Sequence, residues 1–416
     1  MTEYLPLSDI TIVDLSWVIA GPYATQMFNQ LGAKVMRVES KRNFDVTRPD
    51  CTRDPDADFL QEGGWLFQQL NSGKMDISLN LKTTHGREAL EALVKQADVV
   101  VCNYSTTAFK KLRLTYEDLS AVNPNIIVLN ASGMGYTGPY SGFVMYAPPL
   151  QAVSGLAHCV GYEGDQAPFE EYLPLTDYIG SLMIANLLMA AIEYRRRTGE
   201  GQFIDLSQCE GAIAFLGTII LDHQVNGCSH DLIGNHHYAD GAAPHNTYLC
   251  KGDAAWCAIS VASEDEWQRF CHVVDPDGTW SADARFASLE QRVQHQDLLD
   301  QQVSAWTRNH TPQEVGALLQ DNRVSAAPVQ SRMDFLYRDE HIRARTFLVE
   351  QDLPITEKTP NTFLLQQPVA RFPEQPMPEA PPPAPAVGAH TEHILKEMLH
   401  KSEDWIQTGY AEGSFE

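Results

Sequence analysis

Short apolar runs alternate with amphipathic segments along the first half of the chain. Each run is rich in valine, isoleucine and leucine, which is typical of buried strands. The predicted strands are residues 10–15, 34–39, 98–102, 126–130 and 203–207. The predicted helices of this half are residues 22–31, 84–96 and 116–121. Strands that alternate with helices at this spacing predict a parallel α/β sheet with helices on both faces.

The longest apolar run, residues 179–192, lies in a helix expected over about 177–197. Three arginines at 195–197 favour the negative end of the helix dipole and so mark the end of this helix. The run is too short to span a bilayer, and it contains the polar residues Ser181 and Asn186. We therefore expect a helix of a soluble protein and no membrane partner.

The character of the chain changes at about residue 226. The segment that follows is polar and rich in histidine, and it leads into alternating residues around a turn at 251–253, which predicts a β-hairpin. A proline-rich segment at 373–387 is expected to be an extended strap, because proline disfavours helix and sheet alike. These changes predict three parts. They are a large α/β domain at 1–225, a smaller α+β domain at 226–335, and a return segment at 336–416 that ends in a helix.

The formal net charge of −24 restricts the partners of the protein. A strongly acidic chain lacks the positive surface that nucleic acids and anionic membranes attract. Eight cysteines occur without a C-x-x-C pair, which favours reduced thiols in a cytoplasmic protein. The N-terminus shows neither the basic part nor the apolar part of a signal peptide, so we expect a cytoplasmic location.

Several common catalytic signatures are absent from the sequence. The loop after the first predicted strand, residues 16–22, has a single glycine, whereas a dinucleotide-binding Rossmann loop has three. An NAD-dependent oxidoreductase is therefore disfavoured. Four histidines cluster in the polar segment without the regular spacing of metal ligands, so we expect loop histidines and no metal site. They are His230, His236, His237 and His245.

Asp177 stands at the start of the long apolar helix. On spacing alone the pattern favours a structural role, as a capping or first-turn carboxylate that the helix dipole stabilises. The same position also suits catalysis, because a carboxylate that the dipole keeps ionised can attack an activated carbonyl group.

Long stretches of the sequence resemble the class III CoA-transferases, the family of formyl-CoA and carnitine CoA-transferases. The stretches are LSDITIVDLSWVIAGPYATQMFNQLGAKVMRVES, FQQLNSGKMDISLNLKTTHGREALEALVKQADVVVCNY, RRRTGEGQFIDLSQCEGA and GAHTEHILKEM. The resemblance covers nearly the whole chain in order. It implies a Rossmann-like large domain, a smaller α+β domain, and a C-terminal segment that returns to the large domain within an interlocked dimer.

The resemblance also assigns site residues, with Asp177 at the position of the catalytic aspartate. Lys41 or Arg42 substitutes for an arginine of the family that is replaced by Ser40 here, and the glycine-rich loop of the small domain keeps only Gly241. The family's CoA-binding segments fall on Val18, Ile19, Ala20, Leu79, Asn80, Leu81, Lys82, Asn103, Tyr104 and Lys111, and Tyr146 is assigned to the same CoA-binding set. Four lysines would supply local positive charge for the phosphates of CoA. They are Lys74, Lys82, Lys110 and Lys111.

The implied reaction moves CoA from an acyl-CoA donor to a carboxylic acid through mixed anhydrides and an aspartyl-CoA thioester. Succinyl-CoA is one candidate donor. Every step exchanges activated acyl groups of similar energy, so neither ATP nor metal is needed. We therefore expect no permanently bound cofactor, with coenzyme A and its thioesters as substrates.

Two alternatives stay open at this stage. The family includes α-methylacyl-CoA racemases, whose catalytic histidine aligns with Tyr146 here. A tyrosine, with an ordinary pKa of about 10, is a poor base at neutral pH. The chain could also be the less active subunit of a hetero-oligomer, although the presence of Asp177 favours an active homodimer.

Overall fold

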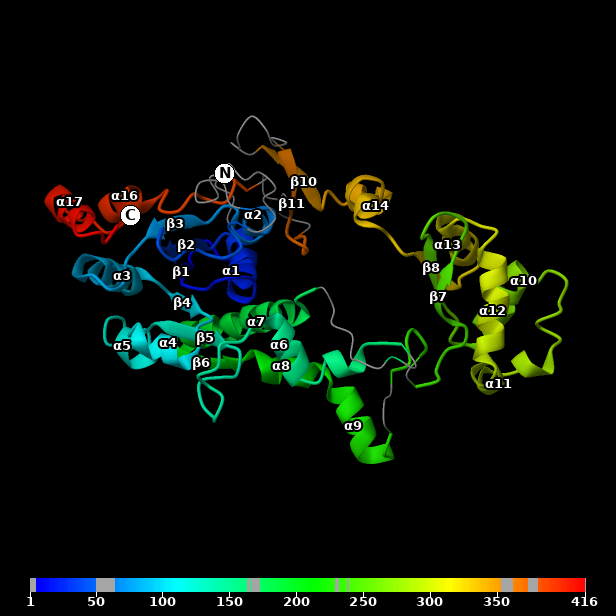
Figure 1. Cartoon of the computed structure of the whole chain (residues 1–416). Helices are drawn as coiled ribbons and strands as arrows, with labels where there is room; N and C mark the ends of the chain where they lie inside the picture. Colours follow the sequence, from blue (N-terminus) through cyan, green and yellow to red (C-terminus); the bar gives the residue numbers. More distant parts are fainter. Residues whose placement is uncertain are drawn as a thin grey trace. The chain divides into compact units, whose positions relative to one another are not determined.

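The computed structural model describes residues 5–49, 64–162, 165, 173–228, 232–237, 239–352, 362–372 and 381–415. The chain forms two compact units (Figure 1). The first unit comprises Met1–Ala157, Glu170–Thr218 and Glu340–Glu416, and the second comprises His158–Phe169 and Ile219–Asp339. The domain limits predicted from the sequence remain a prediction.

The first unit is built on a six-stranded sheet in which every neighbouring pair is parallel. Its strands are β1 (Thr11–Asp14), β2 (Lys34–Glu39), β3 (Met75–Ser78), β4 (Val99–Cys102), β5 (Ile127–Ser132) and β6 (Gln202–Ser207). The order β3-β2-β1-β4-β5-β6 is that of a doubly wound Rossmann sheet, with the change of direction between β1 and β4. The predicted parallel α/β sheet is thus confirmed, and β3 is a strand that the pattern did not predict.

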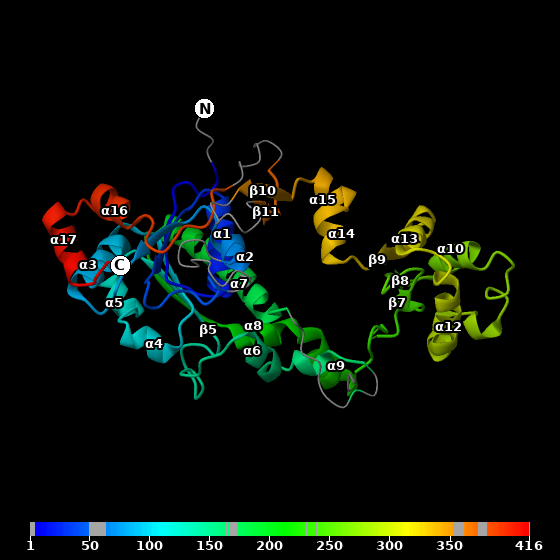
Figure 2. The same ribbon diagram turned by 45° about the horizontal axis from the view of Figure 1, so that its top comes forward.

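Helices cover both faces of this sheet because successive strand residues point to opposite sides. On one face, α1 (Ala20–Gln30) and α7 (Leu175–Thr198) pack over Ile12, Val99 and Val101. The other face, with Val13 and Val100, is covered by helices from the middle and the end of the chain (Figure 2). These are α3 (Thr84–Gln96), α4 (Thr106–Lys111), α5 (Tyr116–Ser120), the π-helical turn Ile394–Met398 that follows α16 (Thr391–His393), and α17 (Glu403–Ala411).

The C-terminal segment covers the β3 edge of the sheet. The N–H of Gly388 donates to Asp76 Oδ1 (2.6 Å), and the N–H of His390 donates to the Asp76 carbonyl (2.9 Å). The N–H of Ser78 donates to Thr391 Oγ1 (3.0 Å). These bonds satisfy an edge that would otherwise present unpaired backbone groups to solvent. The first unit also contains α2 (Trp65–Asn71), α6 (Ala147–Val153), α8 (Gln208–Phe215), α15 (Glu340–Ala344) and the β10–β11 pair (Leu348–Asp352, Thr362–Gln366).

The second unit contains an antiparallel sheet of β7 (His245–Leu249), β8 (Trp256–Ser260) and β9 (Ser325–Pro328). The hairpin predicted around 251–253 joins β7 to β8. Helices cover one face of the sheet around a core that includes Tyr248, Trp267 and Phe270. The helices of this unit are α9 (Gly217–Asn226), α10 (Glu264–Val274), α11 (Leu289–Gln294), α12 (Gln296–Thr307), α13 (Pro312–Asp321) and α14 (Arg332–Tyr337).

Helix α7 is longer than its apolar run suggested. With 24 residues the helix is long and apolar enough to cross a membrane by length and composition alone, whereas the sequence-based expectation concerned only its apolar run at 179–192. Half of its most apolar window is buried inside the protein, as in a core helix of a soluble protein. Ile184, Leu188 and Ile192 supply the face that packs on the sheet.

Candidate active site

The parallel strands of the first unit place their carboxyl ends at one edge of the sheet, which we call the carboxyl edge. The residues assigned to CoA by resemblance follow the ends of β1, β2, β3 and β4. Helix α7 leads into β6, so its first turn, which contains Asp177, begins at the same edge. The fold therefore brings the predicted CoA segments and the predicted nucleophile to one side of the sheet.

The loop after β1 is fixed by side chains from two other segments. Asn103, which follows β4, accepts the N–H of Trp17 at Oδ1 (2.9 Å) and donates from Nδ2 to the Trp17 carbonyl (2.7 Å). The next residue, Val18, has φ of 66° and donates its N–H to Asp45 Oδ2 (3.0 Å). Trp17 and Val18 remain partly exposed, whereas Ile19 is buried. The loop thus presents Trp17 and Val18 at the surface from a buried support.

Lys74 supports the same loop from inside the protein. Its Nζ donates to the Pro22 carbonyl (2.9 Å) and to Thr25 Oγ1 (2.8 Å), and it pairs with Asp14 Oδ2 (3.2 Å). Burial lowers the pKa of Lys74 to about 8, although Asp14 opposes this shift. The suggestion that Lys74 offers surface charge to CoA phosphates is therefore wrong, because the ammonium group is buried and already bonded.

A buried cluster of charged groups lies behind the loops after β1 and β2. Arg37 bonds Asp45 (2.7 Å) and Glu39 (3.2 Å), and Arg48 binds both oxygens of Glu39 (2.9 Å each). Burial acts to raise the pKa of Glu39, but the two arginines outweigh it and lower that pKa to about 2. Burial, reinforced by Glu39, holds the pKa of Asp76 well above its usual range. The cluster is rigid, because each arginine bonds several fixed partners.

Asp177 lies in the first turn of α7, whose start is held by α6. The N–H of Leu175 donates to Gln151 Oε1 (3.1 Å), and Thr176 Oγ1 donates to the Ala147 carbonyl (3.4 Å). The Asp177 side chain is 7% exposed, and its carboxylate accepts no hydrogen bond from the described part of the chain. Among the described residues, Asp177 is therefore positioned through the backbone of α7, with no donor bound to its carboxylate.

Burial raises the pKa of Asp177 to about 7. The sequence suggested a carboxylate that the helix dipole keeps fully ionised, whereas the structure places this group near half-ionisation at neutral pH. The cause is desolvation: the carboxylate gives up water and gains no donor from the described residues in return. A carboxylate of this kind is more basic and less solvated than a surface aspartate, and both properties favour attack on a carbonyl group.

Two tyrosines connect Asp177 to the loop after β1. The ring of Tyr23, in the first turn of α1, lies edge-on to the ring of Tyr178, with centroids 5.4 Å apart. Burial raises the pKa of both phenols. Because Tyr178 is adjacent to Asp177, this contact brings the beginnings of α1 and α7 together. Nothing in the sequence pattern marked Tyr23, Gln151 or Tyr178.

Tyr146 is the residue immediately before α6. Its side chain is exposed. It lies next to Ala147, whose carbonyl accepts the hydroxyl of Thr176, so α6 brings Tyr146 close to the first turn of α7 along the backbone. The structure thus places Tyr146 at the start of α6, near the first turn of α7.

The remaining predicted residues divide between the surface and the interior. Lys41, Lys82 and Lys111 are exposed; Lys41 follows β2, Lys82 follows β3, and Lys111 is the last residue of α4. Leu79 is buried, and Asn80 bonds the C-terminal segment, donating from Nδ2 to the Gly413 carbonyl (3.2 Å). The other residues of the set are Ala20 (buried), Arg42 (exposed), and Leu81 and Tyr104, which pack partly buried against the core. Lys110, also exposed, lies 4.9 Å from the centroid of the Tyr136 ring.

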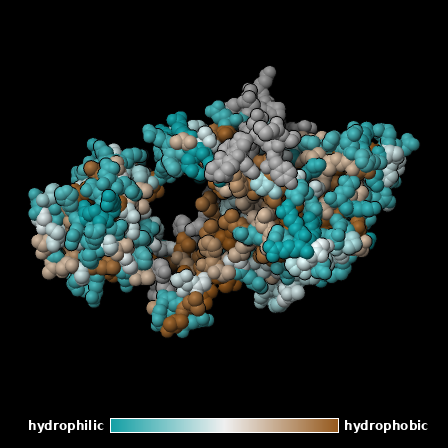
Figure 3. Space-filling view, turned by 180° about the vertical axis from the view of Figure 1, so that it is seen from behind, coloured by the Kyte–Doolittle hydropathy of each residue, from teal (hydrophilic) through white to brown (hydrophobic). Residues whose placement is uncertain are grey.

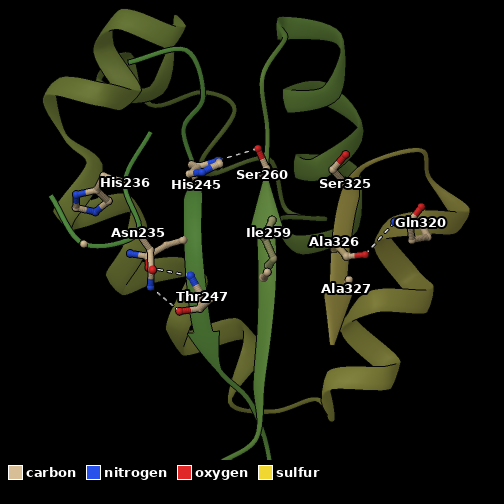
Figure 4. A pocket seen from close by; sticks show the side chains of 13 residues that line it. Asn235, His236, His245, Thr247, Ile259, Ser260, Gln320, Ser325, Ala326 and Ala327 are labelled. Atoms are coloured by element: carbon tan, nitrogen blue, oxygen red, sulfur yellow. Dashed lines mark hydrogen bonds between the residues drawn. The ribbon is translucent and has the colours of Figure 1, made fainter. Parts of the chain in front are cut away.

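The second unit contains a cavity of about 550 Å³ over its three strands (Figure 4). His245 Nδ1 lies 2.8 Å from Ser260 Oγ, and His236 Nε2 lies 3.1 Å from Asp300 Oδ2. Within the described ranges, no three histidines, cysteines or carboxylates converge as metal ligands. His230 lies outside the described residues, and Gly241 belongs to this unit, with its Cα facing the ring of His237.

The doubly wound sheet and the desolvated carboxylate at its carboxyl edge define an α/β enzyme whose ligand site is formed by loops at that edge. Residues 7–391 match CoA-transferase family III. The chain belongs to this family, and it is a CoA-transferase.

Three similar proteins illustrate this relationship. The succinate–glutarate CoA-transferase of Agrobacterium fabrum is 27% identical over 94% of this chain and 96% of its own. The beta subunit of the succinyl-CoA–L-malate CoA-transferase of Chloroflexus aurantiacus is 28% identical over 97% of each chain. The crystal structure of a CAIB/BAIF family protein from Brucella suis matches with a TM-score of 0.82 at 26% identity, covering 95% of this chain and all of the other.

Proposed function

We propose that the protein transfers CoA from succinyl-CoA to a second small dicarboxylic acid, with Asp177 as the nucleophile. The observation that carries the proposal is the state of Asp177 at the carboxyl edge: it is buried, it accepts no hydrogen bond from the described residues, and its pKa is raised to about 7. Two of the similar proteins act on succinate or succinyl-CoA with a dicarboxylate partner by name, which supports this substrate class.

The chemistry proceeds by four exchanges at the Asp177 carboxyl group. The ionised carboxylate attacks the thioester carbonyl and expels CoA thiolate, which leaves a mixed anhydride. The thiolate attacks the aspartyl side of that anhydride, releasing succinate and forming an aspartyl-CoA thioester. The acceptor carboxylate attacks this thioester, giving a second anhydride and free thiolate. The thiolate then attacks the acceptor side, which forms the new acyl-CoA and restores the Asp177 carboxylate.

CoA is proposed to lie along the loops after β1, β3 and β4. Val18 and Trp17 offer partly exposed surface at the point where the strand order changes direction, the usual ligand position in such sheets. Lys82 and Lys111 are exposed and would contact the phosphates. Their charge matters because the chain as a whole is strongly acidic.

The assembly is proposed to be an interlocked homodimer. Apolar side chains lie uncovered on the outer sides of α7 and α8, among them Leu182, Met189 and Phe215 (Figure 3). An apolar surface of this kind is typical of a protein interface. The chain leaves the first unit for His158–Phe169 and again for Ile219–Asp339 before it returns at Glu340, and this return supports a threaded arrangement. Sedimentation should give a particle of twice 46.4 kDa, and a stable monomer would count against the dimer.

Trapping of the aspartyl thioester tests the function. The protein is incubated with succinyl-CoA alone and then treated with hydroxylamine, which should convert Asp177 to a hydroxamate on the peptide that contains LPLTDYIG. Borohydride should reduce the same carbonyl group. Asp177→Asn is the matched control, since it keeps the size of the side chain and cannot form the thioester.

The outcome also separates transferase from racemase. A racemase never breaks the thioester bond, so it would leave Asp177 unmodified while exchanging the α-hydrogen of its substrate with deuterated solvent. That result, obtained with a thioester that the protein demonstrably turns over, would overturn the proposed mechanism. Tyr146 in place of the racemase histidine favours transfer.

A further inference from the structure

Val18 stands in a backbone conformation that its own side chain disfavours. Its φ of 66° lies in the left-handed region, which residues branched at Cβ rarely adopt. Such strain persists only where surrounding contacts hold the backbone in place, and strained residues are common at ligand-binding sites. Trp17, on one side, is fixed by the two bonds from Asn103. Those two bonds reach only the backbone of Trp17, so a second group must hold Val18 itself.

That group is the buried carboxylate of Asp45. Its Oδ2 accepts the N–H of Val18 (3.0 Å) and the Nη2 of Arg37 (2.7 Å). Its Oδ1 accepts both the N–H and the hydroxyl of Thr47 (2.9 Å each). Arg37 also donates from Nη1 to the Ser16 carbonyl (3.1 Å), which ties the same guanidinium to the loop at a second point. With both oxygens engaged, the carboxylate is fixed in direction.

We propose that Asp45 is a positioning residue for coenzyme A, which holds Val18 in the left-handed conformation and so shapes the loop before the ligand arrives. The proposal rests on the proposed function, because that function places CoA at this loop. Asp45 is fully buried, so it acts through Val18 and not through contact with the ligand. A loop already in its bound shape binds more tightly, since no ordering cost remains to be met on association.

A double-mutant cycle tests this role, because glycine adopts a positive φ without strain. The dissociation constant of coenzyme A is measured by titration calorimetry for Asp45→Ala in the wild-type and Val18→Gly backgrounds. We expect about a tenfold weakening in the wild-type background and less than threefold in the Val18→Gly background. If Asp45→Ala fails to fold, Asp45→Asn replaces it in the cycle, because asparagine keeps the shape of the side chain. Asp45→Asn should weaken CoA binding by about threefold in the wild-type background.

Thr47→Val provides the matched control. It removes one hydrogen bond to the same carboxylate and leaves the bond to Val18, so CoA affinity should stay within about twofold while thermal stability falls. Equal weakening by Asp45→Ala in both backgrounds, or none in either, would overturn the proposal. Wild-type protein that binds CoA but transfers no succinyl group would instead contradict the proposed function, and the cycle would still decide the role of Asp45.

Discussion

Asp177→Asn should make the protein more stable, and increasingly so as the pH rises. The folded protein holds the pKa of Asp177 at about 7, against an ordinary value of 3.8. Folding therefore favours the protonated acid, and the ionised form is penalised. The penalty is absent below about pH 4, where both folded and unfolded chains are protonated, and it is complete above about pH 7. Asparagine resembles the protonated acid and escapes the penalty.

The shift of about 3 units corresponds to about 4 kcal/mol at high pH, since each unit is worth about 1.4 kcal/mol. Between pH 5 and pH 8 the difference in unfolding free energy between variant and wild type should grow by about 2–3 kcal/mol. The asparagine amide can also change the unfolding free energy by an amount that does not depend on pH. That amount cancels when the difference at pH 5 is subtracted from the difference at pH 8. The measurement is urea unfolding at fixed protein concentration across that range.

Asp253→Asn is the control, because Asp253 is an exposed carboxylate in the hairpin turn. The unfolding free energy of the Asp253→Asn variant should follow that of the wild type at every pH. If the curves for Asp177→Asn and wild type also run parallel from pH 5 to pH 8, the carboxylate is not desolvated, and the proposed source of its reactivity is lost.

Three further predictions follow from the site. The rate of transfer should rise with pH through an apparent pKa of about 7, because only the ionised Asp177 attacks; a rate that is flat from pH 5.5 to 8.5 would contradict this. Lys111→Ala should weaken CoA binding by about 1–3 kcal/mol in calorimetry, whereas Lys95→Ala, an exposed lysine near the opposite edge of the sheet, should not. Lys74→Met should lower the unfolding free energy by about 3–5 kcal/mol, because the buried Asp14 loses its ammonium partner and keeps only the bonds from Ser16 and Thr25; an unchanged urea midpoint would contradict this.

The sheet could be predicted from the sequence because most of its strands are uniformly apolar and separated by helices of ordinary length. β3 could not, because it has only four residues and the polar side chain of buried Asp76 interrupts its apolar pattern. The Asp76 carboxyl group accepts the N–H of Gly388 and the Asp76 backbone carbonyl accepts the N–H of His390, both more than 300 residues further along the chain. A local sequence pattern cannot predict hydrogen-bond partners that lie so far along the chain.

The role of the loop after β1 was equally hard to predict from the sequence alone. Read as a sequence motif, its single glycine, Gly21, is weak evidence that the loop binds any ligand. In the structure a Cβ at this position would lie 2.2 Å from the Cβ of Ser16, so glycine is required by close packing of α1 on the loop. The position of Asp177 at a helix start could be predicted, because the apolar run begins there. Its burial could not, because that depends on how α6 packs beside α7.

Burial has opposite consequences for the two carboxylates that matter most at the carboxyl edge. Asp45 is buried with its oxygens fully bonded by Arg37, Thr47 and Val18, so it is fixed and unavailable for chemistry. Asp177 is buried with no donor among the described residues, so none of them offsets the cost of its charge. A group in that state gains most from forming an ester-like bond, because acylation removes the charge that burial penalises. The desolvation that lowers stability at high pH therefore favours the covalent intermediate that the reaction requires.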